Sequence, residues 1–190
     1  MAECRRLLLG ITGATGMLYV PKLLELLATA HIEVHGILSD AGRKVLHFEL
    51  GVSPEDLMQV ACWFRADDFT APPASGSARY DAMVVLPCTV GSLAAIAGGI
   101  CGNLLHRAAD VTLKERRPLI LAVRETPLNR THLHNMLTAH KAGAIICPPM
   151  PSFYQHPQNL DDMAQQFAAR ICDLLDVPVS SATIKRWQGI

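Results

Sequence analysis

Charged residues lie on both sides of one apolar run in the middle of the chain. The segment 114–117 (KERR) precedes Leu119–Val123 (LILAV), and Arg124 and Glu125 follow it directly. The run predicts a strand buried on both faces, so Arg124 and Glu125 are expected at the carboxyl edge of a sheet, where ligands bind in open α/β folds. An acid at such an edge can move a proton while a neighbouring cation holds an anion. The alternative is an exposed ion pair that contributes less than about 1 kcal/mol.

Small, hydroxylated and glycine residues follow the other expected strands. They are residues 12–15 (TGAT), Ser39 and residues 88–92 (CTVGS). Such residues let a phosphate approach the backbone N–H groups at the start of a helix. The segment 10–16 (GITGATG) has the spacing GxxGxxG instead of GxGxxG, and Ser39 stands where an acid would hold an adenosine ribose. The pattern therefore disfavours NAD and favours a mononucleotide such as a flavin phosphate.

Hydrophobic periodicity predicts strands that alternate with helices. Continuous apolar runs predict strands at 6–11, 32–38, 82–86, 119–123 and 144–147. Helical patterns cover 18–28, 39–50, 92–98, 103–116, 130–141 and 160–175, and residues 53–56 (SPED) predict the start of a further helix. Apolar runs without alternation are typical of a parallel sheet covered on both faces, so we expect an α/β, doubly wound fold. Residues 1–176 are predicted to form one domain and 177–190 a C-terminal arm.

Composition narrows the classes of function. Half of the 190 residues are hydrophobic and the net charge is zero, which argues against a nucleic-acid binder that works through a global positive field. No run of eighteen apolar residues predicts a membrane span. The six cysteines lie far apart without the spacing of a zinc site, and His132 and His134 face different sides of one helix, so we expect no metal. We expect a cytoplasmic protein with reduced thiols.

Several longer motifs carry a resemblance. They are GITGATG at 10–16, SGS at 75–77, PCTVGSLAAIA at 87–97, RAADVTLKERRPLILAVRETPL at 107–128, PPMPSFYQHPQNLDD at 148–162 and the ending RWQG. Together they resemble the UbiX-type flavin prenyltransferases of the homo-oligomeric flavoprotein family. The resemblance implies a homododecamer with a Rossmann-like, flavin-binding domain. It also implies an enzyme that joins a dimethylallyl group from dimethylallyl monophosphate to reduced FMN, closing a ring across N5 and C6. The product, prenylated FMN, would serve a UbiD-type decarboxylase.

The resemblance also implies roles for individual residues. The FMN contacts would be Gly13, Ala14, Thr15, Ser39, Thr89, Val90, Gly91, Ser92 and Arg124. The prenyl phosphate would be surrounded by Arg107, Lys114, Glu125, Tyr154 and Arg170, with Ser75 joining from the SGS loop. Glu49, Lys114 and Glu125 would be catalytic, and the site would lie between subunits. Cations lower the barrier where charge grows on a departing phosphate, and an acid such as Glu125 can transfer the proton. No DDxxD segment for magnesium is present, which suits a monophosphate donor and a metal-independent reaction.

Three positions depart from the family pattern. Gly91 stands where lysine or asparagine is common, Asp40 where lysine is common, and Ala78 where phenylalanine usually follows SGS. These changes bear on the choice of flavin, phosphate or prenyl chain. One alternative function is an FMN-dependent cysteine decarboxylase, against which PCTVGS lacks the expected asparagine. Another is a flavin carrier without catalysis, against which the predicted catalytic set is intact.

Overall fold

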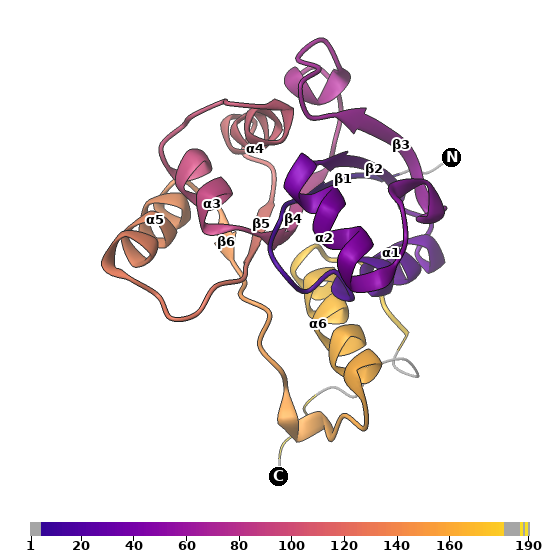
Figure 1. Ribbon diagram of the computed structural model, residues 1–190. Coiled ribbons are helices and arrows are strands. Elements are labelled where there is room, and N and C mark those ends of the chain that lie inside the picture. The colour runs from indigo at the N-terminus through magenta and orange to yellow at the C-terminus, as the bar shows by residue number, and fades with distance from the viewer. Residues whose placement is uncertain (1–4, 181–186, 188, 190) are drawn as a thin grey trace.

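A six-stranded parallel sheet forms the centre of the molecule (Figure 1). The computed structural model describes residues 5–180, 187 and 189. The strands are β1 (Arg6–Ile11), β2 (Glu33–Leu38), β3 (Val60–Arg65), β4 (Ala82–Cys88), β5 (Leu119–Val123) and β6 (Ile145–Ile146). Their spatial order is β3-β2-β1-β4-β5-β6, and every neighbouring pair is parallel. The predicted α/β, doubly wound Rossmann-like class is confirmed.

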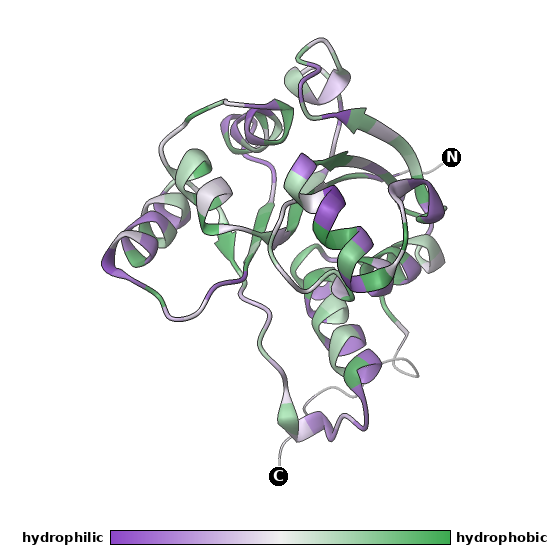
Figure 2. Cartoon of the chain, in the orientation of Figure 1, coloured by the Kyte–Doolittle hydropathy of each residue, from purple (hydrophilic) through white to green (hydrophobic). Residues whose placement is uncertain are grey.

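Helices cover both faces of this sheet. On one face lie α1 (Tyr19–Thr29), α2 (Asp40–Leu50) and α6 (Leu160–Leu174). On the other face lie α3 (Val90–Ala97), α4 (Leu104–Lys114) and α5 (Arg130–Lys141). Successive strand residues alternate between the two cores: Leu7 and Leu9 pack on the α1 side, and Leu8 packs on the α4 side. Figure 2 shows the resulting green central strands, which explains why the strand sequences are apolar throughout.

Side-chain caps begin three helices at the carboxyl edge of the sheet. The Ser39 hydroxyl accepts from the N–H of Gly42 at 3.0 Å, and the Thr89 hydroxyl accepts from the N–H of Ser92 at 3.1 Å. Asn103 caps α4 in the same way. Each cap satisfies one N–H of the first turn, which has no partner within its own helix. The caps therefore fix where α2, α3 and α4 begin relative to the strands before them.

One predicted element is wrong. The segment 53–56 begins only a single 3-10 turn at Pro54–Asp56, and the chain then forms the edge strand β3. The capping box itself is present, with the N–H of Ser53 donating to Asp56 at 2.7 Å. Pairing with β2 decides the outcome, because Gly36 of β2 leaves the room that the Trp63 ring occupies. A cap motif starts a turn, whereas a helix needs an apolar face to bury.

The C-terminal stretch returns to the core before the described residues end. The N–H of Val177 donates to the carbonyl of Cys172 at 2.9 Å, and the Val177 side chain is buried against the α1 side. Much of the predicted arm, residues 181–186, 188 and 190, lies outside the described residues. Within the described part of the chain, no helix is long and apolar enough to span a membrane. The five cysteines of that part, which excludes Cys4, are free thiols.

Candidate active site

The order of the strands reverses between β1 and β4, and the buried side chain of Thr12 ties these two strands together. Its hydroxyl donates to the carbonyl of Pro87 at 2.7 Å and accepts from the N–H of Thr89 at 2.8 Å. Thr12 is only 2% exposed, so both bonds lie away from water. Ligands of open α/β sheets bind at such a reversal. The two loops that follow, 12–16 and 88–92, are therefore held next to each other at the expected place.

The glycine-rich loop after β1 lies against the first turn of α2. A Cβ on Gly13 would stand 2.5 Å from the Cβ of Ala41, so only glycine permits this approach. The Glu49 carboxylate accepts from the N–H of Gly16 at 3.0 Å and from the N–H of Met17 at 2.8 Å. Glu49 thus lies beside the loop that was predicted to contact FMN, and it holds that loop in place. Its part in proton transfer stays a prediction.

The loop after β4 is braced by a histidine of α4. The Nε2 of His106 on α4 lies 3.4 Å from the Ser92 hydroxyl, which itself contacts the Thr89 hydroxyl at 3.2 Å. Burial lowers the pKa of His106 below its ordinary value, so the ring is neutral at pH 7. The Nδ1 of the ring is buried without a partner in the structure. The described structure adds His106 to the predicted site residues.

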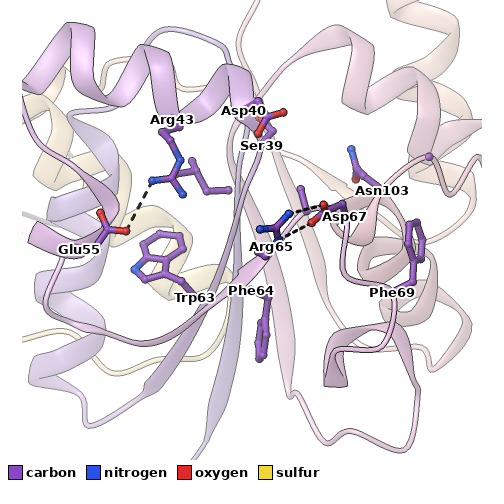
Figure 3. A pocket seen from close by; sticks show the side chains of 13 residues that line it. Ser39, Asp40, Arg43, Glu55, Trp63, Phe64, Arg65, Asp67, Phe69 and Asn103 are labelled. Atoms are coloured by element: carbon purple, nitrogen blue, oxygen red, sulfur yellow. Dashed lines mark hydrogen bonds and ion pairs between the residues drawn. The ribbon is translucent and has the colours of Figure 1, made fainter.

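A cleft of about 690 Å³ opens on the β3 side of Ser39 (Figure 3). Two ion pairs stand at its walls, Arg43–Glu55 at 3.8 Å and Arg65–Asp67 at 2.7 Å. Ser39 is the predicted FMN contact that lines this cleft. Asp40 lines it too, and its negative charge acts on Arg65. The acid at this departure from the family pattern therefore faces a cation within its own chain.

Arg124 and Glu125 lie at the carboxyl edge, as the sequence predicts. The N–H of Arg124 donates to the carbonyl of Cys88 at 3.0 Å, which joins the end of β5 to the end of β4. The Glu125 carboxylate accepts from the N–H of Thr126 at 3.0 Å, and both charged side chains are exposed. The positive charge of Arg124 acts on the half-buried hydroxyl of Tyr19, whose pKa burial raises. The apolar surround expected for Glu125 is not supplied by the described part of this chain.

Tyr154 and Arg170 extend the same edge beyond β6. Tyr154 lies in a short 3-10 turn, Phe153–Gln155, and its ring meets the ring of Trp187 edge to face at 5.4 Å between centroids. Trp187 therefore contacts a predicted phosphate-binding residue. Arg170 is an exposed residue of α6, and its charge acts on the thiol of Cys147 just after β6. Both predicted phosphate contacts are thus exposed, and Arg170 lies near the end of β6.

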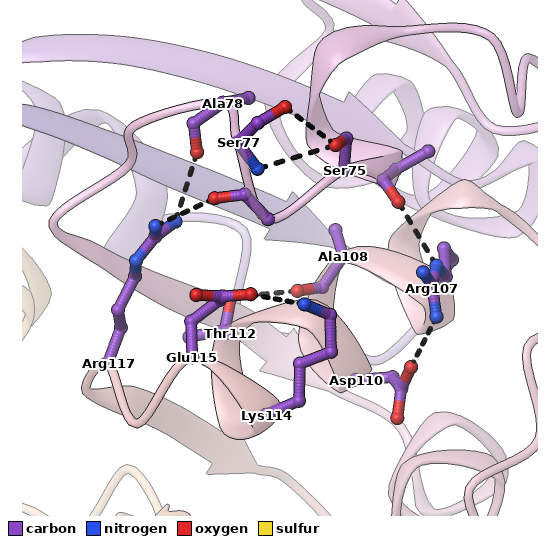
Figure 4. Close-up of polar contacts among 12 residues, drawn as sticks. Ser75, Ser77, Ala78, Arg107, Ala108, Asp110, Thr112, Lys114, Glu115 and Arg117 are labelled. Atoms are coloured by element: carbon purple, nitrogen blue, oxygen red, sulfur yellow. Dashed lines mark hydrogen bonds and ion pairs between the residues drawn. The ribbon is translucent and has the colours of Figure 1, made fainter.

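Ser75, Arg107 and Lys114 form a second, separate cluster beside α4 (Figure 4). Arg107 pairs with Asp110 at 2.6 Å, and Lys114 pairs with Glu115. The Ser75 hydroxyl lies 2.9 Å from that of Ser77. Lys114 ends α4 before β5 begins, whereas Glu125 follows β5. Because a strand of five residues spans about 16 Å, one chain does not bring Lys114 to Glu125.

The predicted site residues therefore divide into two groups. The carboxyl-edge group lies around the ends of β1, β2, β4, β5 and β6 and comprises Gly13, Ala14, Thr15, Ser39, Glu49, Thr89, Val90, Gly91, Ser92, Arg124, Glu125, Tyr154 and Arg170. The α4 group comprises Ser75, Arg107 and Lys114. Glu115 and Arg117 are neighbours of the α4 group: Glu115 pairs with Lys114, and Arg117 binds the carbonyl of Gly76. The sequence does not indicate these contacts, because charged residues at a helix end usually face solvent.

The chemistry of the carboxyl-edge group fits a phosphorylated flavin. Capped helix starts after β2 and β4 offer backbone N–H groups to an anion, and a side chain at Gly91 would meet no atom nearer than 3.9 Å. The buried Cys88 thiol, with its pKa raised to about 12, is no nucleophile at pH 7. Within the described residues, no group of three or more histidine, cysteine, aspartate or glutamate side chains is placed to hold a metal ion.

Fold and site together define a doubly wound α/β protein whose capped helix starts lie at the carboxyl edge of a parallel sheet. The model of the Flavoprotein family matches residues 1–184. The chain is 42% identical to the flavin prenyltransferase UbiX of Methanothermobacter thermautotrophicus over 100% of this chain and 98% of that protein. It is 43% identical to the UbiX of Salmonella typhimurium over 97% of this chain and 99% of that protein. The chain belongs to the flavoprotein family, among the UbiX-type flavin prenyltransferases.

Solved structures agree with this membership. AnUbiX (PadA1), solved in complex with FMN and dimethylallyl pyrophosphate, superposes with a TM-score of 0.95 at 39% identity, covering 99% of this chain and 100% of that one. A dodecameric FMN-dependent UbiX-like decarboxylase from Escherichia coli O157:H7 has a TM-score of 0.92 at 38% identity, covering 97% of this chain and 100% of that one. The cysteine decarboxylase TvaF, at 20% identity and a TM-score of 0.62, shares the fold alone.

Proposed function

We propose that this protein is a flavin prenyltransferase that joins the dimethylallyl group of dimethylallyl monophosphate to reduced FMN. The supporting observation is identity of 42% to a flavin prenyltransferase along the whole chain, together with the TM-score of 0.95 to a structure solved with FMN and dimethylallyl pyrophosphate. In the reaction, the C–O bond to phosphate breaks and the phosphate leaves with the electron pair. One end of the allyl group then bonds to N5, which gives up its proton. The carbon at the other end bonds to C6 as the allyl double bond takes up a proton and C6 loses its own, so one net proton passes to the phosphate. The product is prenylated FMN, which a UbiD-type decarboxylase receives as its cofactor.

The carboxyl-edge group holds the flavin. The N–H groups at the starts of α2 and α3 and the guanidinium of Arg124 compensate the charge of its phosphate. Glu49 keeps the glycine-rich loop in position through its two backbone bonds. Thr12 keeps the loops after β1 and β4 in register. These contacts exist before the ligand binds, so little ordering remains to be done on binding.

The donor phosphate takes its charge compensation from cations. An alkyl monophosphate carries about −1.5 to −2 charges at pH 7, and it gains negative charge as the C–O bond breaks. Arg170 and Tyr154 meet it from the edge group, and Lys114, Arg107 and Ser75 meet it from the α4 group. Glu125 transfers the proton between the ring carbon and the departing phosphate. No metal ion is required in this scheme.

One complete site requires two copies of the chain. β5 keeps Lys114 and Glu125 about 16 Å apart within a chain, so the α4 group of one copy completes the edge group of another. A partner also covers Glu125, which is exposed in the single chain and needs an apolar surround to act as an acid. A closed oligomer repeats this contact at every site. We propose a homododecamer, in keeping with the dodecameric UbiX-like decarboxylase from Escherichia coli O157:H7.

The reaction is tested with reduced FMN and dimethylallyl monophosphate under anaerobic conditions, followed by the mass of the released flavin. The flavin should gain the mass of one prenyl unit. Glu125→Gln should keep FMN bound and slow the transfer at least about tenfold, as expected for loss of a general acid. An unchanged flavin mass with wild-type protein refutes the proposal, and carbon dioxide released from a cysteinyl peptide favours a cysteine decarboxylase instead.

The shared site is tested by complementation. Lys114→Ala and Glu125→Gln subunits, co-expressed in equal amounts, should regain about a quarter of wild-type activity, because that fraction of mixed sites receives both intact residues. Each variant alone is the matched control. Mixed oligomers as inactive as the single variants place Lys114 and Glu125 in the same chain's site and refute the two-copy arrangement.

The free thiols support a cytoplasmic location, because reducing compartments keep cysteines unpaired. Delivery of the product is tested by adding the reaction mixture to a cofactor-free UbiD-type decarboxylase, which should become active. A decarboxylase that stays inactive with the prenylated flavin present contradicts that partnership.

A further inference from the structure

Two guanidinium groups hold the loop that carries Ser75. We call residues 74–78 (ASGSA) the serine loop. Arg107, on α4, donates from Nε to the carbonyl of Ala74 at 3.1 Å. Arg117, which follows the end of α4, donates to the carbonyls of Ala78 at 3.0 Å and Gly76 at 2.9 Å (Figure 4). Two arginines therefore bind three backbone carbonyls of one short loop.

Apart from the two arginines, the serine loop is supported by short-range backbone bonds and by the packing of Ala74 and Ala78 against the α4 side of the core. Ser77 and Ala78 line a groove of about 680 Å³ at the amino ends of β1 and β2, so the loop has a hollow on one side. Ser75 and Ser77 are exposed, and the contacts between their hydroxyls and backbone lie within the loop itself. A segment with exposed side chains and a hollow behind it is held chiefly by its backbone hydrogen bonds. At the tip, the N–H of Ala78 donates to the carbonyl of Ser75 at 3.2 Å, and the long-range hydrogen bonds come from Arg117.

The tip of the serine loop rests directly on the Lys114–Glu115 ion pair. A Cβ on Gly76 would overlap the Glu115 carboxylate and would lie 2.7 Å from the Nζ of Lys114. Arg117 binds the carbonyl of Gly76, the residue that lies closest to the ion pair, and the carbonyl of Ala78. The distance between the Ser75 hydroxyl and the Lys114 ammonium is therefore set by the place where Arg117 holds the loop.

We propose that Arg117 is a positioning residue for the donor phosphate. It holds the serine loop over Lys114 so that the Ser75 hydroxyl and the Lys114 ammonium converge on one anion. This inference rests on the proposed function for its substrate, the prenyl monophosphate. The planar guanidinium reaches two carbonyls at once, which an ammonium group cannot do with the same geometry. A loop released from Arg117 would have to be ordered each time the donor binds, so the cost falls on donor affinity and not on flavin affinity.

The test compares Arg117→Lys and Arg117→Ala with the wild type. Arg116→Asn is the matched control, because Arg116 is an exposed neighbour whose φ of 56° asparagine adopts readily. We expect both Arg117 variants to raise KM for dimethylallyl monophosphate at least about tenfold, which corresponds to about 1.4 kcal/mol. The Kd for FMN should stay within about twofold of the wild type in every variant. Added guanidinium chloride at low millimolar concentration should lower KM of Arg117→Ala and leave Arg116→Asn unchanged.

A second measurement does not depend on turnover. In Arg117→Ala, amide hydrogen exchange should become faster at residues 74–78 and stay unchanged at residues 89–92, which belong to the carboxyl-edge group. Unchanged exchange at 74–78, or a KM within about twofold of the wild type, overturns the inference. An equal loss of FMN affinity and donor affinity assigns Arg117 a general structural role and also overturns it. If the wild type makes no prenylated flavin, the proposed function fails, and the exchange measurement still decides whether Arg117 holds the loop.

Discussion

Replacing Thr12 by valine tests whether one buried hydroxyl organises the flavin edge. Valine has nearly the same shape as threonine, so the change removes the hydroxyl and leaves the packing. The N–H of Thr89 then loses the acceptor it has at 2.8 Å. The carbonyl of Pro87 loses a donor at 2.7 Å but keeps the N–H of residue 12 at 3.2 Å.

The size of the effect follows from these three contacts. Leaving the partly buried N–H of Thr89 without an acceptor costs about 1–3 kcal/mol, and losing the bond to Pro87 costs about 1 kcal/mol more. The sum is about 2–4 kcal/mol of unfolding free energy. For a chain of this length each kcal/mol lowers Tm by about 2–4 °C, so we expect a fall of roughly 4–16 °C. FMN should also bind more weakly, because the loop that starts at Thr89 is no longer fixed to β1.

Thermal unfolding at a fixed protomer concentration measures the change, because oligomer stability depends on concentration. Thr12→Ser keeps the hydroxyl and loses one methyl group, so it should cost only about 1 kcal/mol. Thr29→Val removes an exposed hydroxyl whose bond to the carbonyl of Glu25 lies within α1, and it should change stability by less than about 0.5 kcal/mol. If Thr12→Val is as stable as Thr12→Ser, the hydroxyl does not join β1 to β4 in the way described.

Three further predictions concern the same edge. Gly13→Ala should lower Tm by about 2–12 °C, because the added Cβ clashes with α2. Gly91→Ala, in open space at the start of a helix, should leave Tm unchanged or raise it. Equal Tm values for the two variants would contradict the close approach of Gly13 to α2. Glu49→Gln should lower Tm by about 2–4 °C, because its bonds to two N–H groups lose their charge; an unchanged Tm would show that Glu49 does not hold the loop. Burial lowers the pKa of His35 and His106, so below about pH 6.5 the unfolded chain binds more protons than the folded chain, and the free energy of unfolding decreases as the pH decreases. His106→Asn should make the free energy of unfolding depend less on pH.

His35 shows how a neutral imidazole is used inside the sheet. Its Nε2 lies 2.8 Å from the Glu33 carboxylate and its Nδ1 lies 2.8 Å from the Tyr80 hydroxyl. A neutral ring with its proton on Nε2 satisfies both contacts, donating to Glu33 and accepting from Tyr80. Burial raises the pKa of Tyr80 to about 12, so its hydroxyl keeps the proton that it donates. At low pH a second proton would have to bind Nδ1 of His35, which already accepts from the Tyr80 hydroxyl. This conflict agrees with the predicted loss of stability at low pH.

The structure shows the surroundings of the three residues that depart from the family pattern. Asp40 lines the same cleft as Arg65, whose guanidinium is paired with Asp67 at 2.7 Å, and the charge of Asp40 also acts on that guanidinium. Gly91 leaves open space at the start of α3, where an added Cβ would lie 3.9 Å from the Thr89 hydroxyl. Ala78 packs on the α4 side of the core, and its carbonyl is held by Arg117. The structure gives no reason for alanine there in place of a larger side chain.

The sequence alone determined the class of fold and those members of the carboxyl-edge group that directly follow a strand, whereas Glu49 and Arg170 were assigned only by the family resemblance. Apolar runs without alternation require a sheet covered on both faces, and residues that directly follow strands must lie at one edge when the strands are parallel. Arg124, Thr89 and Ser39 were placed by that reasoning, because each is separated from its strand by at most one residue. The strand β3 escaped it, because its pairing with β2 depends on the room above Gly36, which no local pattern records.

Only the tertiary structure decided how the residues predicted to bind phosphate are divided. Lys114 and Glu125 stand eleven positions apart in the sequence, yet β5 lies between them and spans about 16 Å. Arg117 reads as a solvated helix end in the sequence, whereas in the fold its guanidinium binds two carbonyls of a loop some forty positions earlier. Local residue types set strands, helices and caps through short-range physics. Contacts between distant segments depend on how those elements pack, and that information lies in the three-dimensional arrangement.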